Sequence, residues 1–334
     1  MSIPSHWARH AAEIGAGLTG PEVNPVDARR CTVQLSTGLL YLDAVASPAT
    51  SLLGHDSPPT SATDEPAVKR MLSSLAPHYL CLATAQSFGA AADAAARLGR
   101  LAAGHSASVA QINALGGEPA PRVDLLVVQE NETLGRTGRW LASSAWSRAP
   151  DLIVVGDALA LGSPFGAVLA HTRFVQRFVP GALSRRARTD GKSPSAWVED
   201  AEGATPTALE RVGAAIAAVE REGLLEQGRH LANYLMARLT SMRVSFPQIE
   251  GVEGRGFSVR IALAPPLRAT QIRRSMCERG VLTGVDTVGR LAIDPPLAMR
   301  IAEIDVITGA LRGSLVGLPT ASTSACCAAC LRQG

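Results

Sequence analysis

Short apolar runs, separated by polar and glycine-rich turns, recur through the middle of the chain. The segments 79–84, 123–128, 151–155 and 166–170 are each five or six mostly apolar residues long, which is typical of strands that are covered on both faces of a sheet. Residues 88–103 are rich in alanine and are followed by Gly104, which predicts a helix with a glycine at its C-terminal end. We therefore expect an α/β layer with a partly parallel sheet.

The flanking segments follow a different pattern. Residues 32–43 alternate around a Thr-Gly pair, which predicts a hairpin. From Pro206 to Leu239 the apolar spacing predicts two helices broken near Gly223. The last third alternates predicted strands with predicted helices, in an α+β arrangement: strands at 257–263 and 290–293, helices at 269–279 and 300–312.

These patterns predict a large domain and a small one. The small domain is expected to combine an N-terminal segment with the C-terminal third, and the chain ends in a disordered tail that contains cysteines. The predicted boundaries are 1–45 and 227–317 for the small domain, 46–226 for the large domain and 318–334 for the tail.

Charge and hydropathy exclude several classes of protein. The 32 basic and 29 acidic residues are spread along the chain and give a net charge of only +3, whereas nucleic-acid binding needs a clustered basic surface. No apolar run is long enough to span a membrane, and the first ten residues lack the pattern of a signal peptide. We expect a cytoplasmic protein that binds neither nucleic acid nor a membrane.

The cysteines and lysines limit the possible chemistry. Cys326, Cys327 and Cys330 crowd the tail, but a single CxxC without a second ligand pair is weak evidence for a metal, and no metal site is expected. Only Lys69 and Lys192 occur in the whole chain. Any mechanism that needs a covalent bond to a lysine therefore has two candidates.

The centre of the chain resembles class III aminotransferases. The resemblance is carried by Gly135-Arg136-Thr137-Gly138, by Pro150-Asp151 before an apolar strand, and by the string PFGAVLA at 164–170. Flanking matches at 41–43, 53–58, 222–225, 254–257 and 295–297 extend it over most of residues 30–315. The resemblance implies the type I fold of enzymes that use pyridoxal 5′-phosphate (PLP), a dimer, and transfer of an amino group through a lysine-bound aldimine.

Several positions depart from what the resemblance implies. The lysine position falls on Asp157, and a carboxylate cannot form an aldimine. The aspartate that pairs with the pyridinium nitrogen is expected ten residues before Gly138, at Val128. Glu130 replaces it if the alignment slips by two residues.

Two further departures concern the phosphate of the cofactor. In the Ser-Gly turn expected to hold it, Phe88 stands before Gly89 where a glycine is expected, and its side chain is expected to close the approach to the helix N-terminus. The threonine expected to reach the phosphate from the other subunit is Ala201. We therefore expect that PLP binding is lost and that the protein has no cofactor.

The segment between the first helix and the Gly-Arg-Thr-Gly block is only residues 105–134, much shorter than in the family. We therefore expect a truncated type I PLP-transferase fold, with a partial mixed sheet, and an exposed apolar sheet edge that favours a dimer. The partner is expected to be a second copy or an intact aminotransferase.

Two functional hypotheses remain open after these departures. The first is a non-catalytic homologue that supports an active aminotransferase. The second is a PLP-independent enzyme that reuses the pocket, with Asp157 as acid or base and with His171 and Glu130 as further candidates. The absence of a replacement constellation favours the first hypothesis.

Overall fold

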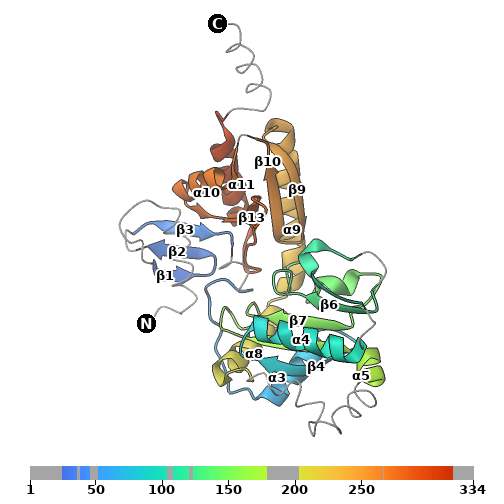
Figure 1. Cartoon of the computed structure of the whole chain (residues 1–334). Coiled ribbons are helices and arrows are strands. Elements are labelled where there is room, and N and C mark those ends of the chain that lie inside the picture. Colours follow the sequence, from blue (N-terminus) through green and yellow to red (C-terminus); the bar gives the residue numbers. More distant parts are fainter. Residues whose placement is uncertain are drawn as a thin grey trace. The chain divides into compact units, whose positions relative to one another are not determined.

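The computed structural model describes residues 25–35, 38–45, 52–103, 108–119, 123–178, 203–265 and 267–318. These residues form two compact units, which Figure 1 traces along the chain. The first unit contains the described parts of 1–49, 54–56 and 227–334, and the second contains those of 50–53 and 57–226. Ala201 and the tail cysteines Cys326, Cys327 and Cys330 lie outside the described residues.

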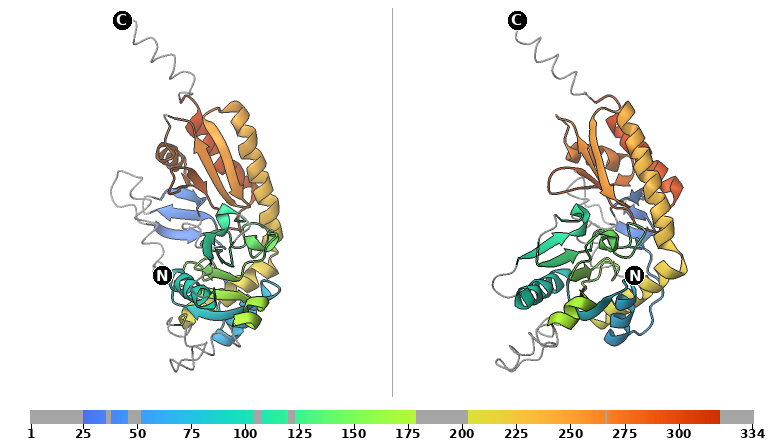
Figure 2. Two further views of the ribbon diagram at one scale, coloured as in Figure 1. Left: turned by 45° about the vertical axis from the view of Figure 1, so that its right-hand side comes forward. Right: turned by 90° about the vertical axis from the view of Figure 1, so that its right-hand side faces the viewer.

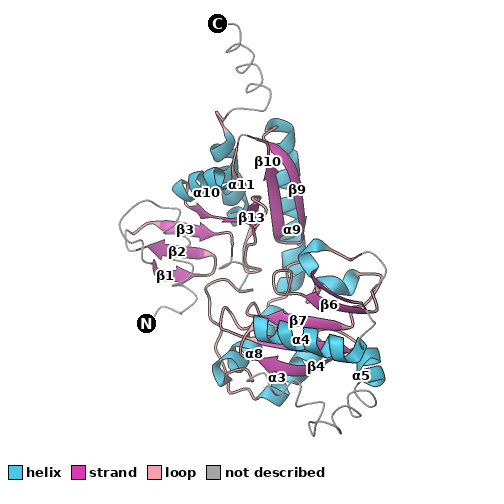
Figure 3. Ribbon diagram, viewed as in Figure 1, coloured by secondary structure: helices cyan, strands magenta, loops and turns pink. Residues whose placement is uncertain are grey.

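A five-stranded mixed sheet forms the centre of the second unit, as Figure 3 shows. Its strand order is β4 (Tyr79–Ala85), β8 (Gly166–His171), β7 (Leu152–Gly156), β6 (Leu125–Gln129) and β5 (Val109–Asn113). Strands β5, β6 and β7 run parallel, and β8 is antiparallel to both of its neighbours. The four strands predicted from apolar runs are confirmed, and β5 is an additional edge strand.

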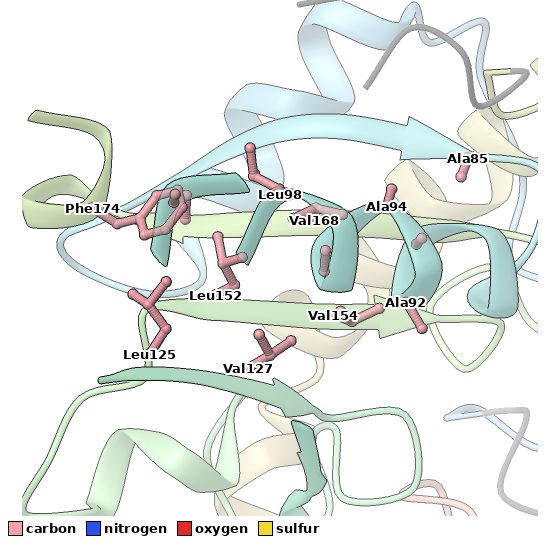
Figure 4. Close-up of a cluster of buried hydrophobic side chains, with 14 residues drawn as sticks. Ala85, Ala92, Ala94, Leu98, Leu125, Val127, Leu152, Val154, Val168 and Phe174 are labelled. Atoms are coloured by element: carbon pink, nitrogen blue, oxygen red, sulfur yellow. The ribbon is translucent and has the colours of Figure 1, made fainter. Parts of the chain in front are cut away.

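Helix α4 (Phe88–Ala103) covers one face of this sheet and has the predicted bounds. Its alanines and Leu98 pack against β6, β7 and β8, with Leu125 and Val127 among the buried side chains (Figure 4). The small alanine side chains allow the helix to approach the strands closely. The alternate β6 residues Leu126 and Val128 pack on the opposite face of the sheet, against the short helical turns η1 (Ala114–Gly116) and η2 (Ala142–Ala145).

The remaining helices of the second unit are α3 (Glu65–Ser74), α5 (Thr172–Phe178) and α8 (Pro206–Arg221). Two of them begin with a capping side chain: Asp64 accepts a hydrogen bond from Ala67 N at the start of α3, and Thr205 accepts one from Ala208 N at the start of α8. Helix α3 packs against β4 and α8. The predicted break after α8 is confirmed, because Gly223 adopts a positive φ of 62°.

The first unit contains two small sheets and three helices (Figure 2). One sheet has the order β1 (Pro25–Arg29), β2 (Thr32–Leu35), β3 (Leu40–Asp43) and β11 (Val281–Leu282). The other has the order β12 (Gly284–Val285), β13 (Leu291–Ile293), β10 (Ser258–Leu263) and β9 (Ile249–Arg255). The helices are α9 (Leu224–Ser245), α10 (Ala269–Glu278) and α11 (Ile301–Leu315).

Two buried pairs of polar side chains stabilise this unit. The Asp43 carboxylate lies 2.9 Å from His55 Nε2, which ties the hairpin to residues 54–56. Arg260 Nη1 lies 2.8 Å from Asp294 Oδ1. None of the helices within the described residues is long and apolar enough to cross a bilayer.

Candidate functional site

The candidate site lies in the second unit, where the carboxyl ends of β6 and β7 meet the amino end of α4. Phe88, the first residue of α4, packs on Gly156, the last residue of β7. A Cβ atom at Gly156 would lie 2.5 Å from Phe88 Cδ2, far inside van der Waals contact. Glycine at position 156 is therefore what allows phenylalanine at position 88.

The same close approach occurs on the neighbouring strand. A Cβ atom at Gly166, the first residue of β8, would lie 2.3 Å from the Ser87 carbonyl oxygen. Because neither glycine has a Cβ atom, the start of α4 packs closely against the end of β7 and the start of β8. The position of the helix N-terminus relative to the strand ends is thus fixed by residues 156 and 166.

The N-terminus of α4 is capped by the Ser87 side chain. Ser87 Oγ accepts a hydrogen bond from Ala90 N at 3.1 Å. Among the described residues, and leaving aside Phe88, Ala90 and the backbone of α4, an added Cβ at Gly89 would have Ser87 Oγ as its one neighbour within 4 Å, at 3.9 Å. The Phe88 ring packs on Gly156 at the end of β7, and the expectation that it closes the approach to the helix N-terminus stays a prediction. The first-turn N–H groups of such a helix favour an anion such as a phosphate.

Gln129, the last residue of β6, is the side chain that our sequence reasoning missed. Leu125 and Val127 lie on the face of the sheet that α4 covers, so alternation along the strand places Gln129 on that face. Val128 is fully buried on the opposite face. A one-residue deletion before Gly135, instead of a gapless count, would have identified Gln129.

Asp157 directly follows β7 and is half-buried. Its Oδ1 accepts a hydrogen bond from Phe165 N at 3.0 Å, and its carbonyl oxygen accepts one from Gly162 N at 3.0 Å. The loop between them turns through Leu161 and Gly162, both with positive φ. Asp157 therefore closes the loop that leads from β7 into β8, and its carboxylate stays at the strand end.

Glu130, which we considered as an acid or base, is buried and held by hydrogen bonds from its surroundings. Its side chain is fully buried. The carboxylate accepts hydrogen bonds from Thr133 Oγ1 at 2.6 Å, Ala142 N at 3.1 Å and Ser143 N at 2.7 Å. These bonds hold the η2 turn against the end of β6, on the face opposite to α4.

His171 lies at the other end of the sheet from Asp157. It ends β8, and its backbone N–H donates to Asp151 O at the start of β7. Since β7 and β8 are antiparallel, the two candidates are separated by the length of β7, roughly 20 Å. Burial, Arg173 and His78 lower the pKa of His171 below its usual value. The structure therefore does not bring Asp157, His171 and Glu130 into one site.

The overall architecture is that of a known class of transferase. The chain superposes on ornithine δ-aminotransferase of Plasmodium falciparum with a TM-score of 0.71 at 18% identity, covering 94% of this chain and 100% of that one. Acetylornithine aminotransferase of Elizabethkingia anophelis gives a TM-score of 0.70 at 16% identity, with 93% and 99% covered. The predicted fold class, a type I PLP-transferase fold, is confirmed.

The sequence assigns the family. The aminotransferase class-III family model matches residues 123–315, more than half of the chain, and the chain belongs to this family. Acetylornithine aminotransferase 1 of Bordetella bronchiseptica is 32% identical over 184 residues, which cover 55% of this chain and 42% of that protein. The acetylornithine aminotransferase of Archaeoglobus fulgidus is 29% identical, with 54% and 42% covered. The alignments thus span less than half of these relatives.

Our prediction that the protein has no cofactor is wrong. The family and the structural neighbours point to PLP, and the ornithine aminotransferase of Toxoplasma gondii, a neighbour at TM-score 0.70 and 16% identity with 90% of each chain covered, has PLP at partial occupancy in its active site. Two described features suit the noncovalent part of such a site: Gly89 lies in the first turn of α4, where backbone N–H groups favour an anion, and Gln129 ends β6 on the α4 face.

Proposed function

We propose that this chain is a class III aminotransferase homologue that holds PLP by noncovalent contacts, does not transaminate, and serves as the non-catalytic partner of an active enzyme. The cofactor is the one that the family implies. The residues that would hold it are Ser87 and Gly89 at the start of α4, for the phosphate, and Gln129 for the ring. PLP supplies an electrophilic carbon and an electron sink when it is bound.

The observation that carries the proposal is Asp157 at the end of β7. A carboxylate has no nitrogen with which to bond the aldehyde carbon of the cofactor, and it cannot serve as the amine that exchanges with a substrate. Instead, the carboxylate accepts a hydrogen bond from Phe165 N and so stabilises the loop that follows β7. Lys69, the one lysine within the described residues, lies on α3 and pairs with Glu65 at 2.9 Å.

Gln129 supports the same conclusion from the ring side. In the family an aspartate keeps a proton on the ring nitrogen, and the carboxylates nearest to that place in sequence, Glu130 and Glu132, lie beyond β6. The Glu130 carboxylate accepts hydrogen bonds from Thr133, Ala142 and Ser143. A neutral amide at the strand end does not stabilise a cationic ring. Two of the groups needed for transamination are thus replaced by groups that still permit binding.

The competing hypothesis of a PLP-independent enzyme is less well supported. Its candidate residues were Asp157, His171 and Glu130, but His171 lies at the far end of β7 and Glu130 is fully buried. The role as a partner follows the prediction of a dimer with a second copy or an intact aminotransferase. The edge strand β5 pairs only with β6 among the described strands, which leaves one backbone edge for association.

The test is reduction of the protein with borohydride in the presence of PLP, followed by mass spectrometry of the intact and digested chain. The wild type and Asp157→Asn should give no adduct at position 157. Asp157→Lys should give one, and Asp157→Lys with Gln129→Asp should in addition transfer amino groups from ornithine to a 2-oxo acid.

Asp157→Asn is the matched control, because its amide oxygen still accepts from Phe165 N while no amine is introduced. Transamination by the wild type at a rate typical of the family would overturn the proposal. The partner role has its own readout. A tagged chain should co-purify with a co-expressed class III aminotransferase, and Asp157→Asn should not weaken that association.

A further inference from the structure

We infer that two copies of this chain associate by antiparallel pairing of their β5 strands, which joins the two five-stranded sheets into one. The inference rests on the proposed function in one respect, since it takes the β5 edge as a surface of association and names its occupant. That occupant is a second copy of the chain, and the two-fold axis passes through Gln111.

The backbone of β5 presents one side to β6 and the other to the outside of the sheet. Leu125 N of β6 donates to Ser108 O at 3.1 Å, and the two strands run parallel. In a parallel pair the N–H and C=O groups of one residue point to the same side, and successive residues point to opposite sides. Ala110 and Ile112 therefore point to β6 as Ser108 does. The groups that point away from β6 belong to three residues: Val109, Gln111 and Asn113.

The other edge strands of the described sheets are protected against pairing. On β4, at the opposite edge of the same sheet, Cys81 N donates to Ser73 Oγ of α3 at 2.9 Å. On β9, which carries charged side chains, Arg243 Nη2 donates to Glu250 O at 2.7 Å. Strand β1 begins with Pro25, and β11 and β12 are each two residues long. Charges, proline, short strands and covering contacts are devices that prevent association through an edge.

Strand β5 shows none of these devices within the described residues. Its sequence, VAQIN, has no charge and no proline, and Gln111 at its centre is exposed. Both ends of the strand are nevertheless held in place: Ser108 N donates to Asp124 Oδ2 at 2.8 Å. At the other end, Leu115 N donates to Asn113 Oδ1 at 2.9 Å. The edge is therefore an ordered template, and a partner strand loses little additional chain entropy on its account.

The strand complements itself when a second copy is turned about Gln111. Gln111 then opposes its own equivalent and Val109 opposes Asn113, as hydrogen-bonded pairs that each exchange two N–H···O bonds. A shift of one residue would set outward-pointing groups against inward-pointing ones. Rotation about an axis perpendicular to the sheet also returns each face to itself. Ile112 of one copy therefore meets Ala110 of the other, on the face where both are partly buried.

The test is sedimentation equilibrium of the full chain over a range of protein concentrations. The wild type should form a dimer that dissociates on dilution, because five residues from each copy make a small interface. Gln111→Pro removes the outward N–H at the axis from both copies and leaves the bonds to β6 intact. Loss of these two bonds should raise the dissociation constant about thirtyfold.

Two further variants at the same position separate the backbone from the side chain. Gln111→Thr is the matched control, since it keeps the N–H group and suits a strand, and it should dimerise as the wild type does. Gln111→Lys keeps the backbone but sets like charges opposite each other at the axis. It should weaken the dimer about threefold, and added salt should restore the association. Circular dichroism checks the fold of each variant.

Backbone hydrogen exchange of the wild type locates the interface. The amides of residues 108–114 should exchange more slowly at high protein concentration than at low concentration, because pairing protects the outward-pointing N–H groups. The amides of β9, the protected edge at 249–255, should exchange equally at both concentrations. This measurement needs no variant, so a misfolded Gln111→Pro protein would not prevent a decision.

Each outcome separates the inference from the proposed function. A monomer at every concentration, or a dimer that Gln111→Pro leaves unchanged, would overturn the inference. Protection of β5 by an added class III aminotransferase, but not by a second copy, would also overturn it and would support the proposed function. Conversely, a dimer through β5 that does not co-purify with such an enzyme would leave the inference standing and remove the partner role.

Discussion

The two ends of strand β7 each carry an aspartate, and the two are used in opposite ways. Asp151, at the amino end, is 7% exposed. Its carboxylate accepts from Leu126 N at 2.9 Å, from Arg148 Nη2 at 3.3 Å and from Arg173 Nη2 at 3.2 Å. Asp157, at the carboxyl end, is half-buried, and its Oδ1 accepts from Phe165 N at 3.0 Å.

The difference separates a stabilising end of the sheet from a binding end. At the amino end, Asp151 joins β6 to two arginines, and Tyr79 Oη donates to Pro150 O at 2.7 Å. At the carboxyl end, Phe88 packs on Gly156, and Ser87 caps the start of α4. In open α/β sheets, ligands bind beyond the carboxyl ends of the strands, which agrees with this division. The comparison predicts that stability depends on one end and ligand binding on the other.

The largest effect on stability is expected from Asp151→Ala. The change leaves Leu126 N without its acceptor and two arginines without their shared carboxylate, which should lower the free energy of unfolding by about 3 kcal/mol. Urea denaturation followed by circular dichroism measures it. Asp157→Asn is the matched control at the other end and should cost under about 1 kcal/mol. Equal losses in the two variants would contradict the division of roles.

The positions of most elements in this unit could be predicted because they are long or strongly apolar. The alanine-rich segment predicts helix α4 with its observed bounds, because no other pattern of apolar residues overlaps it. Strand β5 was missed because its sequence, VAQIN, is short and partly polar, as suits an edge strand with only one neighbour. Its place in the sheet depends on pairing with β6, which no local pattern reveals.

The candidate site could be predicted only in part. Asp157 follows from the sequence because the Pro150-Asp151 strand and the string 164–170 align without a gap. The position of Gln129 did not follow, because a shift of one residue moves a side chain to the other face of a strand. Val128 and Gln129 differ by that one step. The direction of the Phe88 ring could not be predicted either, since it depends on Gly156, which is distant in sequence.

A smaller effect is expected at the binding end from Gly156→Ala. The new methyl group would lie 2.5–2.9 Å from three Phe88 atoms, which should cost about 2 kcal/mol. Phe88→Gly removes all three atoms, so the double variant should be more stable than the sum of the single changes predicts. A double-mutant cycle in urea measures this coupling. Gly116→Ala, where an added Cβ meets nothing within 4 Å, is the control and should be nearly neutral.

The smallest effect concerns His171 at the stabilising end. Burial lowers its pKa, with Arg173 and His78 adding to the shift, and its ring stacks on His78 at 6.1 Å. The folded state therefore holds the proton less tightly than the unfolded chain does. Well above the unfolded pKa of about 6.5, His171 is neutral in both states and does not lower the free energy of unfolding. As the pH falls through that value, the unfolded state gains the proton first and stability declines.

The decline should be less than about 1 kcal/mol, since the ring is only partly buried and water screens its charge. It should level off once the pH has fallen below the lowered folded pKa. Urea midpoints of the wild type and His171→Gln, compared at about pH 8 and about pH 5.5, measure it. Glutamine cannot gain a proton, yet its amide oxygen can replace Nδ1 as the acceptor for Arg173 N, which now donates at 3.1 Å. The variant should therefore lose less stability between the two pH values than the wild type. An equal loss in both proteins would place the titrating group elsewhere and remove His171 from the contacts that make this end of β7 the stabilising one.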